Sequence, residues 1–312
     1  MTLGIKNRTG DTWRRSIKRD WQLYLLLMFP VAMVVLFNYA AYPGLRLVLL
    51  DYMPAKGYLG SQYVGLAMFQ KVFADATFYK ALRNSIVFNL LDLIVGFPTP
   101  IFLALMLNEL RMPRFKKVSQ TILYLPHFLS WAIVGNVAYT MFKPSSGLVN
   151  MFLMRIGLIE NGIPFLNEKW HWAVTYLLIG VWQSMGWNTI IYLAGIAGIS
   201  AELYEAAMID GAGRWKRMWH VTLPGIRGTI VTLLIMNLGR VMGSNLERLT
   251  VFSNSMVRDF QYQLAVYIYE NGLQASKFSQ STIVNLFQSL VGLGLVLGSD
   301  RVAKLLGEDG LI

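Results

Sequence analysis

The sequence predicts an all-α integral membrane protein with six transmembrane helices. Of its 312 residues, 55% are hydrophobic and 14% are charged, whereas a soluble domain carries about 25% charged residues. The apolar residues gather in runs of about 20, the length that crosses a bilayer core about 30 Å thick. Because backbone groups in lipid must satisfy their hydrogen bonds internally, each run is expected to be helical.

The six predicted spans alternate with charged segments. Their approximate bounds are 22–42, 82–107, 119–142, 171–199, 225–246 and 280–299. The fifth is the least regular, because Asn237, Arg240 and Asn245 interrupt its apolar run. Polar side chains are costly inside a membrane, so we expect those in the spans to face the interior of the bundle.

The division of the chain follows from these spans. We expect one transmembrane domain over 22–299, which includes a cytoplasmic loop over 200–224. A basic tail over 1–21 precedes this domain, and a second tail over 300–312 follows it.

The distribution of basic residues predicts the orientation. The N-terminal tail carries six of them, namely Lys6, Arg8, Arg14, Arg15, Lys18 and Arg19. The loops 108–118 and 200–227 carry four each, and basic residues are sparser in the longer loops 43–81, 143–170 and 247–279. Since lysine and arginine accumulate in cytoplasmic loops, both termini are expected in the cytoplasm and the longer loops on the outer face.

Composition also excludes several classes of function. Cysteine is absent, which excludes disulfide scaffolds and thiolate chemistry. The net charge of +11 lies mostly in short loops, where topology and anionic lipid explain it better than a nucleic-acid partner does. The histidines His127, His171 and His220 do not have the spacing of metal ligands, and no acidic cluster accompanies them. We therefore predict neither a catalytic site nor a metal site in this chain.

The most informative segment is the cytoplasmic loop after the fourth span. Residues 201–209 are predicted to form a short helix with an acidic first turn, ended at Gly211. A basic and aromatic stretch over 214–220 follows, and Leu223-Pro224 is expected to begin the next span, since proline is tolerated in a first helical turn. Residue chemistry alone leaves two interpretations open, an amphipathic helix at the membrane surface or a docking contact with another protein.

The order of residues in this loop resembles the EAA loop of ABC-importer permeases. That pattern is Glu-Ala-Ala, three residues, Gly, nine residues, Ile, one residue and Leu-Pro. The chain matches it at Glu205, Ala206, Ala207, Gly211, Leu223 and Pro224, with Val221 in place of Ile. Segments 96–100, 107–110, 124–131 and 271–274 also look like the polysaccharide branch of carbohydrate importers, nearest to the permeases of bacterial alginate importers. The resemblance covers essentially the whole chain and implies the fold of a maltose-type ABC type I importer permease.

The resemblance implies that energy arrives from another chain. In this family the EAA segment is a coupling helix seated in a separate ATP-hydrolysing subunit. The present chain has no G-x-x-x-x-G-K-[ST] sequence with which to cradle nucleotide phosphates. The match implies these coupling residues: Glu205, Ala206, Ala207, Asp210, Gly211, Val221, Leu223 and Pro224. We therefore expect a non-catalytic permease subunit without a cofactor, with ATP and Mg bound by the partner ATPase subunits.

The resemblance also implies an assembly and a place for it. We expect two ATPase subunits, a second permease subunit in a heterodimer with this chain, and a periplasmic solute-binding protein that docks on the loops 143–170 and 247–279. This assembly would lie in a bacterial inner membrane. It would import an oligosaccharide or polysaccharide, such as the acidic polymer alginate, by alternating access.

Polar side chains in the fourth and fifth spans predict the substrate path. The candidates are Gln183, Ser184, Trp187, Asn188, Asn237, Arg240, Val241 and Ser244. The four on the fifth span recur at i, i+3, i+4 and i+7, which places them on one face of a helix. Amides and hydroxyls beside an aromatic ring suit a sugar, and in maltose-type permeases the helices that flank the EAA loop line the cavity. The alternative is that these groups only bridge helices.

Arg240 requires an anionic partner or water, because it lies within a span. Asp92 of the second span can supply an internal ion pair. Alternatively, the guanidinium can meet a carboxylate of a uronic-acid oligosaccharide. Both interpretations stay open at this point.

An ion- or proton-coupled secondary transporter of a small polar solute is the competing class. Such transporters have inverted repeats and broken helices around a coupling-ion site, whereas Asp92 is the only carboxylate within the predicted spans. A scaffold or a membrane enzyme is a third class, for which the sequence offers no catalytic cluster.

Overall fold

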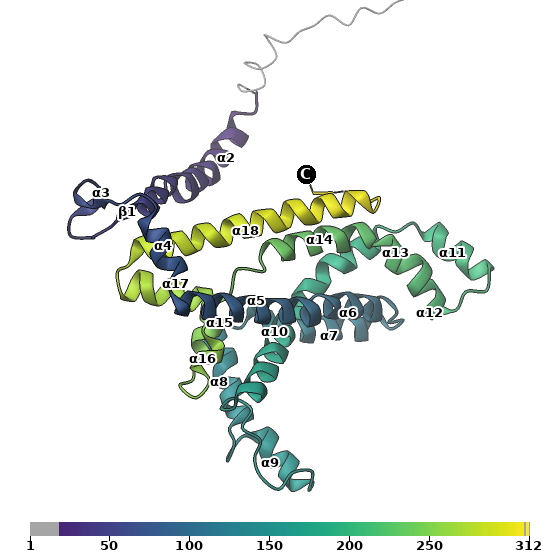
Figure 1. Ribbon diagram of the computed structural model, residues 1–312. Coiled ribbons are helices and arrows are strands. Elements are labelled where there is room, and N and C mark those ends of the chain that lie inside the picture. Colours follow the sequence, from purple (N-terminus) through teal and green to yellow (C-terminus); the bar gives the residue numbers. More distant parts are fainter. Residues whose placement is uncertain (1–18, 309, 312) are drawn as a thin grey trace, which may run out of the picture.

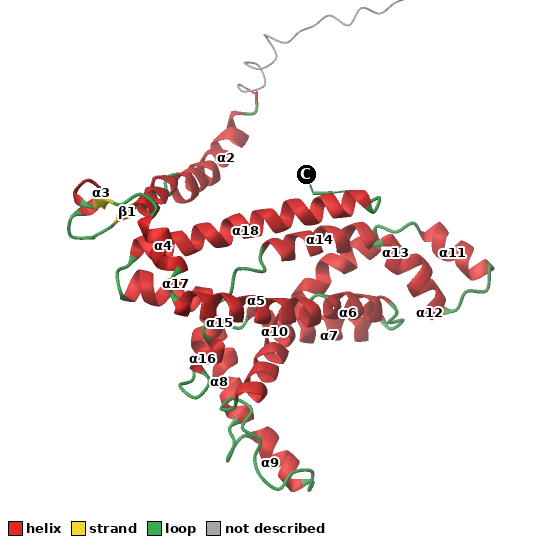
Figure 2. Cartoon of the chain, in the orientation of Figure 1, coloured by secondary structure: helices red, strands yellow, loops and turns green. Residues whose placement is uncertain are grey.

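The fold is built from helices that run across one elongated bundle, as a computed structural model shows (Figure 1). The structure describes residues 19–308 and 310–311. Strands are confined, within this range, to an antiparallel pair of β1 (Leu50–Asp51) and β2 (Gln62–Tyr63) (Figure 2). Five of the six basic residues predicted to mark the N-terminal tail lie outside the described residues.

The α-helices keep the numbering of Figure 1. They are α2 (Trp21–Val34), α3 (Gly57–Gly60), α4 (Ala67–Phe73), α5 (Ala76–Gly96), α6 (Pro98–Asn108), α7 (Pro113–Tyr124), α8 (Trp131–Phe142), α9 (Leu148–Arg155), α10 (Lys169–Ala197), α11 (Ala201–Ile209), α12 (Arg214–Arg217), α13 (Leu223–Gly225), α14 (Arg227–Gly239), α15 (Leu246–Val251), α16 (Arg258–Gln261), α17 (Leu264–Ile268) and α18 (Phe278–Leu305). The 3-10 segments are η2 (Tyr42–Leu49) and η3 (Leu125–Phe128), and the π-helical segments are η1 (Val35–Tyr39), η4 (Met218–Thr222) and η5 (Tyr269–Gln274).

Three helical runs of the described chain are long and apolar enough to cross a membrane, and the number rises to six if each of three bent pairs is one span. The straight runs are Trp21–Leu49, Ala76–Asn108 and Phe278–Leu305. The bent pairs are Pro113–Phe128 with Trp131–Phe142, Lys169–Ala197 with Ala201–Ile209, and Arg214–Gly225 with Arg227–Gly239. Each of these six runs or pairs overlaps one of the six predicted spans.

The third predicted span, 119–142, is a bent pair of helices and not a straight helix. Its two halves meet at an angle of 104°. Pro126 lies in the 3-10 turn that ends the first half, and the Ser130 hydroxyl caps α8 by accepting from the N–H of Ile133 at 3.4 Å. Proline and a capping serine together make a helix boundary.

The fifth predicted span ends at Gly239, seven residues before the predicted bound of 246. Arg240 follows the last helical residue, and the Asn245 side chain accepts from the N–H of Arg248 to begin α15. The chain therefore turns where continuous helix was predicted. Gly239 lies against α18, where a Cβ on Gly292 would come within 2.6 Å of the Gly239 carbonyl oxygen.

The last span is longer than predicted, because α18 continues to Leu305. Residues 300–305, which the sequence places in the tail over 300–312, are thus helical. Asp300 is buried and its carboxylate accepts from the N–H of Leu311, so the segment after the helix folds back onto it.

The core consists of three apolar clusters. One joins α8, α10 and α15 around Trp172 and Phe252, and another joins α5, α17 and α18. The third lies at the other end of the bundle, where Tyr192 meets Ile226.

Near the first turn of α5, the Lys80 ammonium donates to Asp259, which lowers the pKa of that carboxylate below its usual range.

Candidate substrate cavity and coupling segment

The predicted coupling helix is present as α11, with the predicted bounds 201–209. The Ser200 hydroxyl caps it by accepting from the N–H of Glu202 at 3.3 Å. Gly211 follows with a φ of +76°, in the left-handed region that glycine adopts at no steric cost. All nine residues of α11 are exposed or half-buried, and the apolar side chain of Ile209 is 87% exposed. The helix therefore presents a largely open surface at one end of the molecule (Figure 1).

The predicted coupling residues are distributed along this exposed end. Glu205, Ala206, Asp210, Gly211 and Pro224 are exposed, whereas Ala207, Val221 and Leu223 are half-buried. One contact links α11 to the end of the same segment, and a second links the segment to Glu109, which follows α6. The Tyr204 hydroxyl lies 3.0 Å from Thr222 Oγ1, and Arg214 lies 3.7 Å from Glu109.

The position of Pro224 differs from the prediction. Leu223 to Gly225 ends the helical run that starts at Arg214, and the next helix, α14, begins at Arg227 after a bend of 58°. The preceding π-helical turn η4 alters the hydrogen-bond pattern where proline has no N–H to donate. The proline therefore precedes the bend and does not begin the span.

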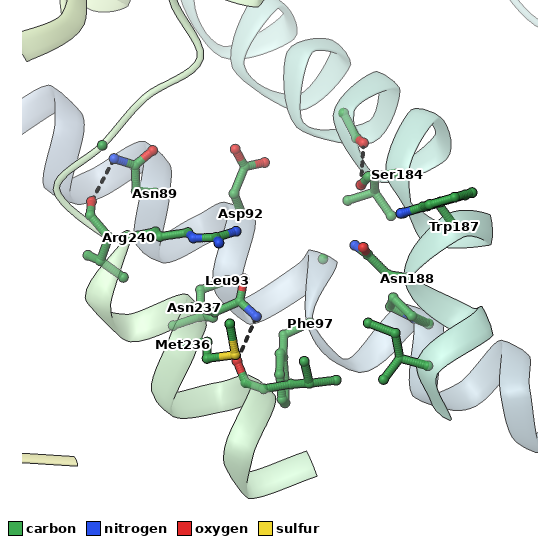
Figure 3. Close-up of a pocket in the computed structure, with 18 of the residues that line it drawn as sticks. Asn89, Asp92, Leu93, Phe97, Ser184, Trp187, Asn188, Met236, Asn237 and Arg240 are labelled. Carbon is green, nitrogen blue, oxygen red and sulfur yellow. Dashed lines mark hydrogen bonds between the residues drawn. The ribbon is translucent and has the colours of Figure 1, made fainter. Parts of the chain in front are cut away.

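A cavity of about 530 Å³ lies between α5, α6, α10 and α14. Six of the predicted path residues line it: Ser184, Trp187, Asn188, Asn237, Arg240 and Val241. Figure 3 shows Trp187 and Asn188 on one wall, from α10, and Asn237 and Arg240 on another, from the end of α14. Asn89 and Asp92 of α5, which the sequence marks as polar positions of the second span, line the cavity as well.

Two of the predicted path residues do not line the cavity. Gln183 is buried and its amide lies 3.4 Å from the carbonyl oxygen of His127. The Ser244 hydroxyl donates to Gln263 and accepts from Asn89. The spacing that placed Ser244 on the same face as Asn237 assumed a helix through 246, whereas α14 ends at Gly239.

Arg240 does not pair with Asp92. The Asp92 carboxylate accepts from Arg248, with Nη1 at 2.8 Å and Nη2 at 3.4 Å. The guanidinium of Arg240 extends into the cavity (Figure 3) and has no ion pair or hydrogen bond with the described part of the chain. The internal ion pair weighed for Arg240 therefore belongs to a different arginine.

Arg248 is the cavity residue that the sequence reasoning missed. It is only 7% exposed, its Nη2 donates to the Tyr176 carbonyl oxygen at 2.6 Å, and its guanidinium carbon lies 3.7 Å from the Tyr176 ring centroid. The sequence places Arg248 in the loop 247–279, because the predicted fifth span ends at 246. The signal that marks it is an arginine two residues beyond an apolar run, close enough to fold back into the bundle.

Trp187 presents a fixed aromatic surface. Its ring stacks on His127, with centroids 4.7 Å apart and planes 6° apart, and Phe128 meets it edge-on. The ring is 41% exposed and lines the cavity. An indole supported in this way can contact the apolar face of a ring-shaped ligand.

The comparisons with known sequences agree on one family. The family model of the binding-protein-dependent transport system inner membrane component matches residues 72–299. The polygalacturonan/rhamnogalacturonan transport system permease protein YteP of Bacillus subtilis (strain 168) is 41% identical over 301 residues, which cover 96% of this chain and 93% of that one. Protein LplB of the same organism is 37% identical over 302 residues, which cover 97% and 94%.

Solved structures match over the same range. A bacterial alginate ABC transporter, in complex with an alginate pentasaccharide-bound periplasmic protein, contains a chain with a TM-score of 0.84 and 33% identity. The match covers 95% of this chain and 99% of that one. These relatives favour an importer permease over a secondary transporter, a scaffold or an enzyme. The chain belongs to the family of binding-protein-dependent transport system inner membrane components.

Proposed function

We propose that this chain is the permease subunit of an ATP-driven importer of acidic oligosaccharides. The observation that carries the proposal is the guanidinium of Arg240, which has no partner among the described residues and extends into a cavity lined by amides and an aromatic ring. Asp92, Arg240 and Arg248 give the cavity walls a formal net charge of +1. A carboxylated sugar supplies the charge that balances Arg240, and a bidentate contact with arginine is a strong way to hold a carboxylate.

The other polar groups of the cavity fit a carbohydrate. The Asn188 amide has no hydrogen-bond partner among the described residues and lies on the wall opposite Arg240. Trp187 offers its ring beside it. The relatives support this class, because YteP is named for polygalacturonan and rhamnogalacturonan and the matched structure for the acidic polysaccharide alginate.

The coupling segment supports an external source of energy. The exposed helix α11 carries Glu205, Ala206 and Ala207 at the end of the molecule. In our proposal, two ATPase subunits hold ATP and Mg, and one of them receives this helix. A second permease subunit completes the pathway, and a periplasmic binding protein docks on the 143–170 and 247–279 loops.

Transport by the reconstituted importer tests the proposed function. We expect Arg240→Gln to lower uptake of a galacturonate or mannuronate oligosaccharide about 10- to 100-fold, as the loss of a charge-assisted contact worth about 1.5–3 kcal/mol predicts. Uptake of the same oligosaccharide with its carboxylates reduced to alcohols should be low in the unaltered importer and insensitive to the substitution.

Arg46→Gln is the matched control, because Arg46 is exposed in η2 and is not among the residues that line the cavity. Unchanged uptake of the acidic oligosaccharide by an assembled Arg240→Gln importer would contradict the role of Arg240. Uptake of neutral oligosaccharides alone by the unaltered importer would contradict the substrate class.

A further inference from the structure

Side chains on one face of α5 make hydrogen bonds and an ion pair with the part of the chain that follows α14. Ser85, Asn89 and Asp92 recur at i, i+4 and i+7, so they lie on the same side of this helix. Ser85 Oγ accepts from the N–H of Leu264 at 2.8 Å, and the Asn89 amide donates to the Val241 carbonyl oxygen at 2.7 Å. The third contact is the ion pair between Asp92 and Arg248.

This ion pair is asymmetric. The Arg248 side chain is 9% exposed and its Asp92 partner 30%. Both residues line the cavity, and Asp92 is the more exposed member of the pair. Arg248 comes from the six-residue helix α15, whereas Asp92 is fixed on the 21-residue helix α5.

One N–H group of the Arg248 guanidinium has no acceptor in the described structure. Nη1 and Nη2 bond Asp92 and the Tyr176 carbonyl oxygen, but Nε is buried without an acceptor in the described structure. The group is held between α5 and α10, over the Tyr176 ring, and Gly180 leaves the space that it occupies. A buried arginine without its carboxylate is strongly unfavourable, so any separation from Asp92 requires another anion.

We propose that Arg248 is a carboxylate-exchange site, at which a carboxylate of the substrate replaces Asp92. This inference rests on the proposed import of acidic oligosaccharides. An incoming carboxylate takes the place of Asp92 on Nη1 and Nη2, and Asp92 is released toward the cavity. When Asp92 returns to Arg248, it displaces the substrate carboxylate. Because Asp92 competes for the arginine in this way, the acidic sugar is released and does not stay bound to Arg248.

Removing the competitor tests the exchange. We expect Asp92→Asn, in the importer purified with its partner chains, to bind a galacturonate trisaccharide about tenfold more tightly and to release it correspondingly more slowly. Asp92→Asn/Arg248→Gln, which removes both charges, should lose this gain. The carboxyl-reduced trisaccharide should bind all three forms alike.

Glu247→Gln is the matched control, because Glu247 is an exposed carboxylate on the same helix as Arg248 and is not a cavity residue. Unchanged affinity of an assembled Asp92→Asn importer for the acidic trisaccharide would overturn the exchange and leave a structural ion pair. An increase that persists in the double variant would overturn the role of Arg248.

A second measurement uses the unaltered importer, in case Asp92→Asn does not assemble. Saturation with the acidic trisaccharide should raise amide hydrogen exchange in α15, whose tie to α5 is released, whereas the carboxyl-reduced sugar should not. Unchanged exchange with bound acidic sugar would overturn the proposal. An unaltered importer that neither binds nor transports acidic sugar refutes the proposed function itself, which is a separate result.

Discussion

At the scale of single residues, the two arginines of the cavity differ in what surrounds them. Arg248 has a carboxylate, a backbone carbonyl and an aromatic ring around its guanidinium. Arg240 is exposed to the cavity and is not paired within the described chain. A buried charge persists only when paired and hydrogen-bonded, so Arg248 stays buried while Asp92 or another carboxylate pairs with it, whereas Arg240 is open to a ligand.

The space beside Arg248 is a testable part of this framework. We predict that Gly180→Ala destabilises the protein by about 1–3 kcal/mol, as overpacking of a filled interior does. The added Cβ would lie 2.2 Å from Arg248 Nη2 and 2.3 Å from Cζ, so the guanidinium must move away from Asp92. Thermal unfolding of the purified importer measures the effect.

Gly294→Ala is the control for that substitution. Gly294 also lies in a long helix, and a Cβ at this position meets nothing within 4 Å. Because alanine favours helix more than glycine does, this variant should be as stable as the unaltered protein or slightly more stable. Equal melting temperatures of the two variants would show that the Arg248 site tolerates displacement.

Residue chemistry in the sequence predicted the cavity better than it predicted the ion pair inside it. Ser184, Trp187 and Asn188 were found because polar groups in an apolar run are conspicuous. For Arg240 the sequence left two partners open, Asp92 or a substrate carboxylate, because Arg240 and Asp92 both lie within predicted spans. The pairing with Arg248 depends on the turn after Gly239, which tertiary contacts determine and which no local pattern announces.

At the scale of elements, α11 was predictable because its boundary signals are local. Ser200 caps its first turn, and Gly211 takes the left-handed conformation two residues beyond its last residue. The fifth span lacks signals of this kind. Its helix stops without proline, and hydrogen bonds from Asn89 and Gln288 to the carbonyl oxygens of Val241 and Met242 hold the turn that follows.

The left-handed turn after α11 leads to a prediction about coupling. Gly211→Ala should disturb the end of the coupling helix, since a left-handed conformation costs a residue with a Cβ about 1–2 kcal/mol. We expect weaker retention of the ATPase subunit on purification and more ATP hydrolysed per transport event. Gly213→Ala is the control two residues away, with an ordinary φ of −65° and open space around its Cβ. Equal ATPase retention by both variants would contradict a role for the turn.

At the scale of the whole molecule, much of the apolar surface is still uncovered. Every residue of α2 is exposed, and the helix projects away from the bundle (Figure 1). Large contiguous apolar surfaces are covered by lipid or by other proteins. The high share of hydrophobic residues in the sequence predicted this exposed apolar surface. The spacing of the apolar runs predicted the number of spans. The bends of 104° and 58° were not predictable from hydropathy, because a broken span and a straight one have the same composition.

The orientation of the whole chain is the remaining prediction. Both termini should lie in the cytoplasm, because the basic residues of the 108–118 and 200–227 loops should stay on that side. The absence of cysteine from the sequence makes the test clean, since every introduced thiol is then unique and the unaltered protein is an unlabelled control.

Lys117→Cys and Met256→Cys place single thiols at exposed positions of a basic loop region and of the predicted outer loop, respectively. In intact cells stripped of their outer membrane, a membrane-impermeant maleimide should label Met256→Cys and spare Lys117→Cys. Inverted vesicles should give the opposite result, because only the cytoplasmic face is then accessible. Labelling of Lys117→Cys from the outside would reverse the orientation and place α11 on the side without ATP.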